Sequence, residues 1–371
     1  MRNSKVKILF VLQDLEIGGA EQLKFTVEKY IDKNRYSTAY CCLKRLGAIG
    51  EEMKKSGADL VTLNSSDKFY NLKTTYRLYK LTKKIDPDLI HSVLFNANFH
   101  ARIIGILMRK PVITEEQGMY TWKRWYHILI DKLLEHFTYR IIAASNSVKD
   151  FIIAQEKIRP DKIVVLHNCI DPESLKTETT RDGEREKLSL SANDFAIGAI
   201  GKLRKEKGHS VLLDAFKIVF TKYYNARLFI VGEGPLYASL TTKSRELALE
   251  EKVFFLGSRS NVSGFLKSMD LFVMSSLSEG LGIALVEAIF AGLPCVASDV
   301  GGMREVARES EGVVLVRPGD PQKLADAIIN EIERQKGKRD GPLSVQNNVR
   351  EKFTPKFYVN RLKDIYEGAL Q

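Results

Sequence analysis

The chain has 371 residues, of which 44% are hydrophobic and 28% charged, and its formal net charge at pH 7 is +11. This length exceeds what one hydrophobic core usually serves, so we expect two globular domains, and the composition excludes disordered and fibrous classes. The four cysteines are too scattered for a disulfide framework or a metal-binding cluster. We therefore expect them to be reduced and mostly buried, as in a cytosolic protein.

The positive charge gathers in the first half of the chain. Residues 1–175 hold 28 Lys/Arg against 20 Asp/Glu, a balance of +8, while residues 176–371 hold 29 against 26, a balance of +3. Such an excess attracts a membrane, a nucleic acid or a phosphorylated substrate, and charge by itself does not choose among them. No apolar run approaches the roughly 18 residues that cross a bilayer, and Ile8–Leu12 is too short for an export signal.

Taken in order, short aliphatic runs alternate with helical patterns. KILFVL (7–12) predicts a strand, and EQLKFTVEKYI (21–31) predicts a helix with an apolar face of Leu23, Val27, Tyr30 and Ile31. The charge-rich segment 173–193 is interpreted as a solvated linker. Beyond it, strands are predicted at FAIGAI, RLFIV, KVFFL, DLFVM, PCVAS and GVVLV, with helices between most of them. Aliphatic strands alternating with helices predict an α/β protein whose halves are both doubly wound around parallel sheets.

Each half begins with a strand, a glycine-bearing loop and a helix, and ligands of such sheets bind at the carboxyl ends of the strands. In the first half the loop is IGGAE (17–21), where Gly18 and Gly19 would let the backbone approach a ligand. Glu21 would then bind substrate together with these glycines. An ordinary turn, in which Glu21 complements the helix dipole, explains the motif equally well.

The corresponding loop of the second half is GKLRKEKG (201–208). Its lysines Lys202 and Lys207 could converge on a diphosphate and stabilise charge on a departing nucleotide. Most charge runs are solvated loops, but the position at the end of a strand favours the functional interpretation.

The stretch EGLGIALVE carries two carboxylates, Glu279 and Glu287. If the stretch were all helical, they would lie roughly 12 Å apart along the axis, whereas a glycosidase pair flanks one bond at roughly 5 to 9.5 Å. The glycines instead predict a loop that carries Glu279 and a helix, from near Ile283 to Ala291–Gly292, that carries Glu287 on its second turn.

The helix start between these carboxylates suits an anion. We expect free amide groups there, and carboxylates that accept hydrogen bonds from hydroxyls; the expected nest is formed by Gly280, Leu281, Gly282 and Ile283. Each carboxylate, taken singly, also has a purely structural explanation. Glu279 could cap the helix, and Glu287 could be a surface residue.

At this point a resemblance emerges that covers nearly the whole chain. The motifs GGAE, GKLRKEKG, VGEGP, LGSR, SSLSEGLGIALVEAIFAGLPCVASDVGG, GVVLVRPGDPQKLADAI and FYVNRLKDIYEGAL occur in the order seen in family 4 retaining glycosyltransferases, which the chain resembles. The resemblance implies the GT-B fold, with two Rossmann-like domains facing an interdomain cleft. It implies an acceptor domain over 1–172 with helix 355–371 packed back on it, a linker over 173–193, and a donor domain over 194–354.

The same resemblance assigns roles to the motif residues. Glu279 would contact the donor sugar, Glu287 the ribose, and Lys202 and Lys207 the diphosphate. The family more often has Arg where this chain has Lys202. A lysine offers the phosphate a point charge in place of the two parallel hydrogen bonds of a guanidinium group. Further residues would line the donor site, namely Gly18, Gly19, Gly232 and Arg259.

The chain departs from the family on the acceptor side. DLIHSVLFNANFHARI resembles a segment in which a strand ends in His-x-His, with the second His near the reacting sugar. His91 matches the first position, but Val93 occupies the second. His91, expected as a catalytic residue, Asn96, expected to bind substrate, or Asn98 could supply polar contacts instead, although a lone His at a strand end is more often structural.

The resemblance implies a retaining transferase that moves a hexosyl or N-acetylhexosaminyl group from a nucleotide diphosphate sugar to a glycan or lipid-linked acceptor. Cell-surface polysaccharide or lipopolysaccharide synthesis would be its setting, without metal, cofactor or nucleic acid. Asp86 and Asp88 have the spacing of a metal-binding DxD motif, but we interpret them as a helix-to-strand connector. Two alternatives stay open: a nucleotide-sugar epimerase or hydrolase on the same fold, and a non-catalytic nucleotide-sugar-binding subunit.

Two segments mix cations with aromatic groups at helical spacing, KFYNLKTTYRLYKLTKK (68–84) and TWKRWYHILIDKLLEHFTYR (121–140). A buried helix with a solvated basic face and an interfacial helix explain this pattern about equally. The charge of the first half favours a cytoplasmic protein that contacts an anionic inner membrane surface peripherally.

Overall fold

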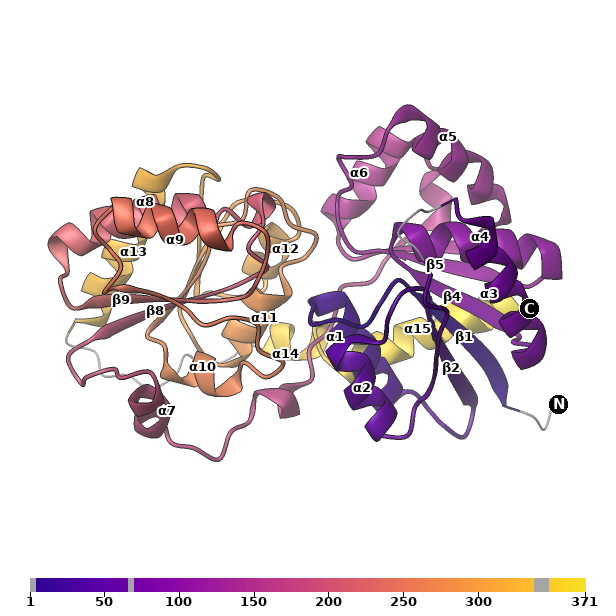
Figure 1. Ribbon diagram of the computed structural model, residues 1–371, viewed down its shortest axis with the longest axis horizontal. Coiled ribbons are helices and arrows are strands. Elements are labelled where there is room, and N and C mark those ends of the chain that lie inside the picture. The colour runs from indigo at the N-terminus through magenta and orange to yellow at the C-terminus, as the bar shows by residue number, and fades with distance from the viewer. Residues whose placement is uncertain (1–4, 66–69, 337–346) are drawn as a thin grey trace. The chain divides into compact units, whose positions relative to one another are not determined.

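The computed structural model describes residues 5–65, 70–336 and 347–371. It divides into two compact units, one formed by Met1–Cys169 with Thr354–Gln371 and the other by Ile170–Phe353 (Figure 1). The first two residues of the basic segment 68–84 lie outside the described residues.

The first unit is built on a parallel sheet of seven strands in the order β3-β2-β1-β4-β5-β6-β7. Inside this sheet, the strands Leu89–Val93 and Val112–Glu116 are buried at every residue because helices cover both faces, as expected for continuous aliphatic runs. The strands are β1 (Val6–Leu12), β2 (Tyr36–Cys42), β3 (Asp59–Thr62), β4 (Leu89–Val93), β5 (Val112–Glu116), β6 (Arg140–Ala143) and β7 (Ile163–Val165).

The helices of the first unit follow these strands, and the last helix of the chain joins them. The helices are α1 (Gly19–Tyr30), α2 (Gly47–Lys55), α3 (Leu72–Ile85), α4 (Phe95–Met108), α5 (Trp125–Leu134), α6 (Asn146–Glu156) and α15 (Pro355–Leu370), with short 3-10 turns η1 (Glu135–Phe137) and η2 (Pro160–Lys162). Helix α15 packs against α1, and Tyr358 and Leu362 enter the core while Ile365 and Ala369 pack partly against it. Tyr30, expected on the apolar face of α1, is instead exposed, because α1 ends there and the chain turns away at Ile31.

The second unit repeats the design with six parallel strands in the order β10-β9-β8-β11-β12-β13. All six strands expected from the sequence are present: β8 (Phe195–Ile200), β9 (Ala226–Val231), β10 (Val253–Phe255), β11 (Leu271–Met274), β12 (Cys295–Ser298) and β13 (Val313–Val316). The helices are α7 (Arg181–Lys187), α8 (His209–Lys222), α9 (Tyr237–Glu246), α10 (Ser263–Ser268), α11 (Ile283–Phe290), α12 (Met303–Arg308), α13 (Pro321–Gln335) and α14 (Asn347–Lys352), with turns η3 (Pro172–Leu175) and η4 (Lys205–Lys207).

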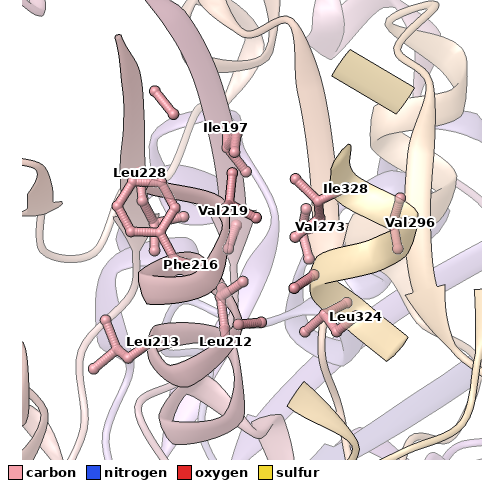
Figure 2. Close-up of a cluster of buried hydrophobic side chains, with 14 of the residues drawn as sticks. Ile197, Leu212, Leu213, Phe216, Val219, Leu228, Val273, Val296, Leu324 and Ile328 are labelled. Atoms are coloured by element: carbon pink, nitrogen blue, oxygen red, sulfur yellow. The ribbon is translucent and has the colours of Figure 1, made fainter. Parts of the chain in front are cut away.

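One face of this second sheet is covered by α8 and α13, which pack on each other as well as on the strands. Figure 2 shows Phe216 and Val219 of α8 and Ile328 of α13 in one cluster of buried side chains with Val273 of β11. Burying side chains of this size contributes about 1.5 to 3 kcal/mol each. This core holds the carboxyl ends of β8 and β11 in fixed positions.

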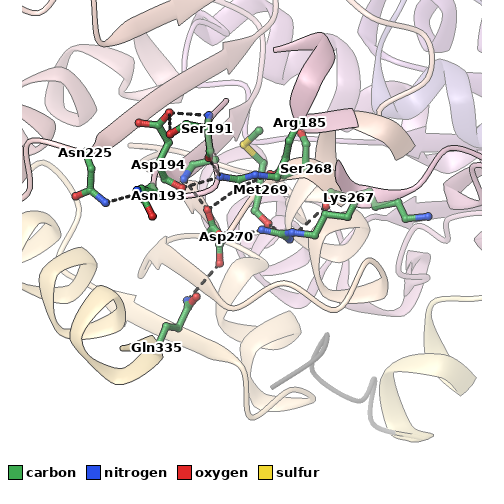
Figure 3. Close-up of polar contacts among 12 residues, drawn as sticks. Arg185, Ser191, Asn193, Asp194, Asn225, Lys267, Ser268, Met269, Asp270 and Gln335 are labelled. Carbon is green, nitrogen blue, oxygen red and sulfur yellow. Dashed lines mark hydrogen bonds and ion pairs between the residues drawn. The ribbon is translucent and has the colours of Figure 1, made fainter. Parts of the chain in front are cut away.

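The polar segment 173–193 forms η3 and α7 and packs on the second unit through α10. Arg185 is buried there, and its guanidinium donates to Asp270 Oδ2 at 3.1 Å and to the carbonyl of Asp194 at 2.7 Å (Figure 3). The segment has a composition typical of a solvated linker, yet its Arg185 is buried in the second unit and hydrogen-bonded there.

All four cysteines are free and buried, as expected. Within residues 5–65, 70–336 and 347–371, no helix has the length and apolar character needed to cross a bilayer.

Candidate active site

The loop 201–208, which follows β8, is fixed against the end of β11 in the second unit. Gly208 has a φ of +64°, and a Cβ there would lie 2.0 Å from the carbonyl oxygen of Ser275. The Ser275 hydroxyl donates to the carbonyls of Lys207 and Gly208, at 3.2 and 3.1 Å. Glycine is required at 208 because any side chain would push the two loops apart.

This contact brings together two residues that the sequence predicted for the donor site. Lys207 Nζ lies 2.5 Å from Glu279 Oε2, and both side chains keep partial access to solvent. The Ser276 hydroxyl also donates to Glu279 Oε2, at 3.2 Å. Lys202 is exposed at the start of the same loop.

The chain between Glu279 and α11 presents unused amide groups. Helix α11 begins at Ile283, as expected, and Gly282 caps it in the left-handed region with a φ of +92°. In the described part of the chain, the backbone N–H groups of Leu281, Gly282, Ile283 and Ala284 have no acceptor. Gly280, just before them, accepts from the amide of Gly302 at 2.9 Å. Four successive N–H donors at a helix start form an anion-binding concavity.

Glu287 lies on the second turn of α11, in a largely apolar surrounding. It is partly buried, and no described residue pairs with its carboxylate through a hydrogen bond or an ion pair. Burial raises the pKa of Glu287 to about 7. A carboxylate in this state gains from a ligand that donates hydroxyl protons to it.

Two further predicted residues lie on neighbouring loops of the second unit. Gly232 has a φ of +147°, and a Cβ there would lie 2.0 Å from the carbonyl oxygen of Gly201. Gly232 also bridges to Gly257, which places Arg259 two residues beyond that contact. The Arg259 side chain is exposed, and no ion pair to it occurs among the described residues.

In the first unit, most of the predicted acceptor-side residues gather at the carboxyl ends of β1 and β4. A small pocket there is lined by Leu12, Gln13, Asp14, Leu15, Ala20, Glu21, Val93 and Leu94. Asn96 stands beside it and donates to Gln13 Oε1 at 3.2 Å. Gly18 and Gly19 begin α1 at the same edge, but Gly18 has an extended φ of −176° that any residue adopts, so its conformation does not require glycine.

His91 does not reach this pocket, so the catalytic role expected for it does not fit the structure. Its ring is fully buried, with Nδ1 2.7 Å from the Tyr366 hydroxyl of α15 and Nε2 3.1 Å from Glu115 Oε2. Burial lowers the pKa of His91, so the ring is neutral, donates from Nε2 to Glu115 and accepts from Tyr366. His91 joins α15 to the sheet.

Glu115 is one of the residues that the sequence did not reveal. Burial alone would raise its pKa, but Lys24, with Nζ 2.5 Å away, and His91 outweigh burial and lower the pKa to about 2. Lys24 and Glu115 are both inaccessible to solvent. Neither stands out in sequence, because a lysine in α1 and a glutamate at the end of β5 are typical of surface positions.

His209 was also missed, although it directly follows the loop 201–208. It is buried, and its Nε2 donates to the carbonyl of Gly201 at 3.3 Å. Burial lowers the pKa of His209 to about 4, so it holds the loop as a neutral ring. The sequence signal was only a histidine at the first position of α8.

The pair Asp86 and Asp88 lies between α3 and β4, as the connector interpretation predicts. Asp86 Oδ1 pairs with Lys110 Nζ at 2.8 Å, and Asp88 Oδ2 accepts from the amide of Lys7 at 2.9 Å. Across the described ranges, no three His, Cys, Asp or Glu side chains are grouped so as to hold a metal ion.

Two family models together match most of the chain. The model of "Glycosyltransferase Family 4" matches residues 17–174, and that of "Glycosyl transferases group 1" matches residues 180–343. Among solved structures, HepE of Anabaena in complex with UDP and glucose superposes with a TM-score of 0.87 at 22% identity, over 98% of this chain and 100% of that one. The fold is therefore GT-B.

Curated relatives agree with the family models. The chain is 28% identical to the UDP-Gal:alpha-D-GlcNAc-diphosphoundecaprenol alpha-1,3-galactosyltransferase of Escherichia coli, over 80% of this chain and 79% of that protein. It is 25% identical to the capsular polysaccharide biosynthesis glycosyltransferase CapM of Staphylococcus aureus, over 82% of each. The chain belongs to the family 4 glycosyltransferases, and its relatives act in polysaccharide and lipid-linked sugar synthesis.

Proposed function

We propose that this glycosyltransferase is a retaining enzyme that moves a hexosyl or N-acetylhexosaminyl group from a nucleotide diphosphate sugar to a lipid-linked or glycan acceptor. The setting would be the synthesis of a cell-surface polysaccharide or lipopolysaccharide. The observation that carries the proposal is a grouping on one edge of the second sheet. It consists of Lys207, Glu279, the amides at the start of α11 and Glu287, and these amides and Glu287 have no partner among the described residues.

Each part of this grouping suits one part of a nucleotide sugar. The free amides before α11 and the exposed Lys202 would hold the diphosphate. Glu287 would accept hydrogen bonds from the ribose hydroxyls, which favour its charged form and so lower its raised pKa. When the diphosphate binds, Lys207 would exchange Glu279 for a phosphate oxygen, and this would free Glu279 to accept from sugar hydroxyls.

The reaction would proceed on one face of the sugar. The bond between the anomeric carbon and the diphosphate oxygen breaks, the acceptor oxygen bonds to the same face of that carbon, and the acceptor proton passes to the departing phosphate. No protein base is needed in this scheme, which fits an enzyme with Val93 where the family has histidine. Lys207 and the amides stabilise the charge of the leaving diphosphate, and so no metal or cofactor is required.

The acceptor is proposed to bind at the pocket of the first unit, near Glu21 and Asn96. Two relatives support an acceptor of this class by their names, one acting on a diphosphoundecaprenol-linked sugar and one in capsular polysaccharide biosynthesis. The structure of HepE with UDP and glucose makes UDP sugars the first donors to test.

A thermal-shift screen of the whole chain against UDP, GDP, ADP and dTDP sugars would identify the donor, because a ligand that binds the native state raises the melting temperature. Transfer to lipid-linked sugars would then be followed, and the anomeric configuration of the product read by proton NMR. An inverted product would contradict the retaining mechanism.

Two controls separate the alternatives. Complete conversion of the donor without any acceptor would identify an epimerase or hydrolase. Donor binding with no transfer to any lipid or glycan extract would identify a non-catalytic subunit.

A further inference from the structure

Helices α3, α4 and α5 with η1 cover part of one face of the sheet of the first unit, and α6, which connects β6 to β7, completes that face. The strand order carries the chain from β3 through β4 and β5 to β6 in one direction, so the right-handed crossovers place these helices on the same side (Figure 1). Thr75 of α3 lies 2.8 Å from His100 Nδ1 of α4, and Arg102 of α4 pairs with Asp131 of α5 at 2.6 Å. The helices therefore form one continuous layer.

The outer surface of α5 and η1 is apolar along its whole length. Trp125, Leu129, Leu133 and Phe137 follow one another at intervals of four residues, and all are exposed, Trp125 at 75% and Leu133 at 59%. Trp122, just before α5, is exposed as well. Spacing of four places these side chains on one stripe of the helix. Soluble proteins rarely leave such a stripe uncovered.

The adjoining helix α4 extends this apolar surface. Ile106 and Leu107 are exposed near its end, and α4 packs against η1, which carries Phe137. The patch thus runs from one helix onto the next.

The outer surface of α3, on the other side of α4, is cationic. Lys73, Arg77, Lys80 and Lys84 recur every three or four residues and are exposed. Tyr76 and Leu72 are exposed on the same helix. Their spacing places a line of positive charge parallel to the apolar stripe.

No carboxylate faces outward from these three helices. Helices α3 and α4 contain no acidic residue. Those of α5 and η1, Asp131 and Glu135, are buried and paired with cations. The outer surface of α3, α4, α5 and η1 thus combines apolar and aromatic groups with charge of one sign.

We propose that this surface docks on a lipid bilayer that contains anionic headgroups. Tryptophan and leucine partition into the boundary between headgroups and acyl chains, and the lysines and arginine of α3 complement the negative surface charge. A second copy of the chain fits less well, because it would bring the same cations onto each other. The proposal concerns a lipid surface and does not depend on which donor or acceptor the enzyme uses.

The test is co-sedimentation of the purified full-length chain with sucrose-loaded vesicles of phosphatidylcholine, with and without 30% phosphatidylglycerol. We expect binding only to the anionic vesicles, weakening as salt rises. Trp125→Ser/Leu133→Ser should lower the partition coefficient at least tenfold. Lys73→Gln/Lys80→Gln/Lys84→Gln should lower it roughly tenfold to hundredfold, since each cation near such a surface contributes a factor of about five. All five positions are exposed, so the fold should survive.

Matched variants on the second unit control for general loss of hydrophobicity or charge. Tyr224→Ser/Tyr237→Ser removes two exposed aromatic groups, and Arg245→Gln/Arg308→Gln/Lys323→Gln removes three exposed cations. Both should bind vesicles like the unchanged chain. Equal loss in the controls, absence of binding to anionic vesicles, or a dimer that the Trp125→Ser/Leu133→Ser variant dissociates would each overturn the proposal.

Discussion

Glu287 should lower the stability of the second unit at neutral pH, and Glu287→Gln should restore it. The carboxyl has a pKa of about 7 in the folded chain against 4.5 for the ordinary group. Between these two values the folded state keeps a proton that the unfolded state has released, so stability falls as the pH rises from 4.5 to 7. Above pH 7 the full penalty is present, and below 4.5 it is absent.

The shift from 4.5 to about 7 corresponds to about 3 kcal/mol if the group were fully buried. Because Glu287 keeps partial access to solvent, we expect on the order of 1 to 3 kcal/mol. For a unit of this size, that raises the melting temperature of Glu287→Gln by about 2 to 10 °C. The gain should be seen at pH 8 and vanish at pH 4.5.

The assay is differential scanning calorimetry at pH 4.5 and pH 8, with Glu311→Gln, an exposed acid of the same unit, as the control. The same variant should bind the donor about 5- to 100-fold more weakly, because a charge-assisted hydrogen bond contributes about 1 to 3 kcal/mol. A melting temperature at pH 8 that stays unchanged or falls would refute the reasoning.

Other residues give three further predictions. Lys207→Ala should abolish measurable transfer while the circular dichroism spectrum is kept; near-normal turnover at saturating donor would remove its diphosphate role. Lys24→Met removes the cation that pairs with the buried Glu115 and leaves its charge to neutral hydrogen-bond partners such as His91, so it should destabilise the first unit by about 3 to 5 kcal/mol. Unfolding in urea would be followed by fluorescence, because both tryptophans lie in that unit. Adding Glu115→Gln should recover part of this loss, whereas additive losses would show that the two groups are not coupled. Gly208→Ala forces a left-handed φ and a contact with a carbonyl oxygen, so it should lower the turnover number well below that of Ser210→Ala, an exposed neighbour.

Local chemistry let the sequence predict the strands and the start of α11. FAIGAI coincides with β8, and the glycines of EGLGIALVE place the first residue of α11 at Ile283. Aliphatic runs and left-handed glycines act within a few residues, so their effects can be recognised without knowing the fold. The alternation of these strands with helices also predicted the doubly wound class, which the two parallel sheets confirm.

Partnerships between distant residues could not be predicted in this way. His91 is bonded to Tyr366, which lies 275 positions later in the chain, and Lys24 is bonded to Glu115. In the sequence each of these residues has the character of a site or surface residue. Only the docking of α15 and α1 on the sheet removes them from water and makes them structural.

Glu279 and Glu287, the two glutamates of the proposed donor site, illustrate the difference between local and tertiary determinants. That Glu279 lies in a loop and Glu287 on a helix follows from the glycines between them, because backbone conformation is a local property. In contrast, the charge pairing of the two glutamates follows from how β8 and β11 lie side by side in the sheet. Glu279 pairs with Lys207, whereas Glu287 has no partner among the described residues. Tertiary packing decides charge pairing and desolvation, since both depend on groups brought together from remote parts of the chain.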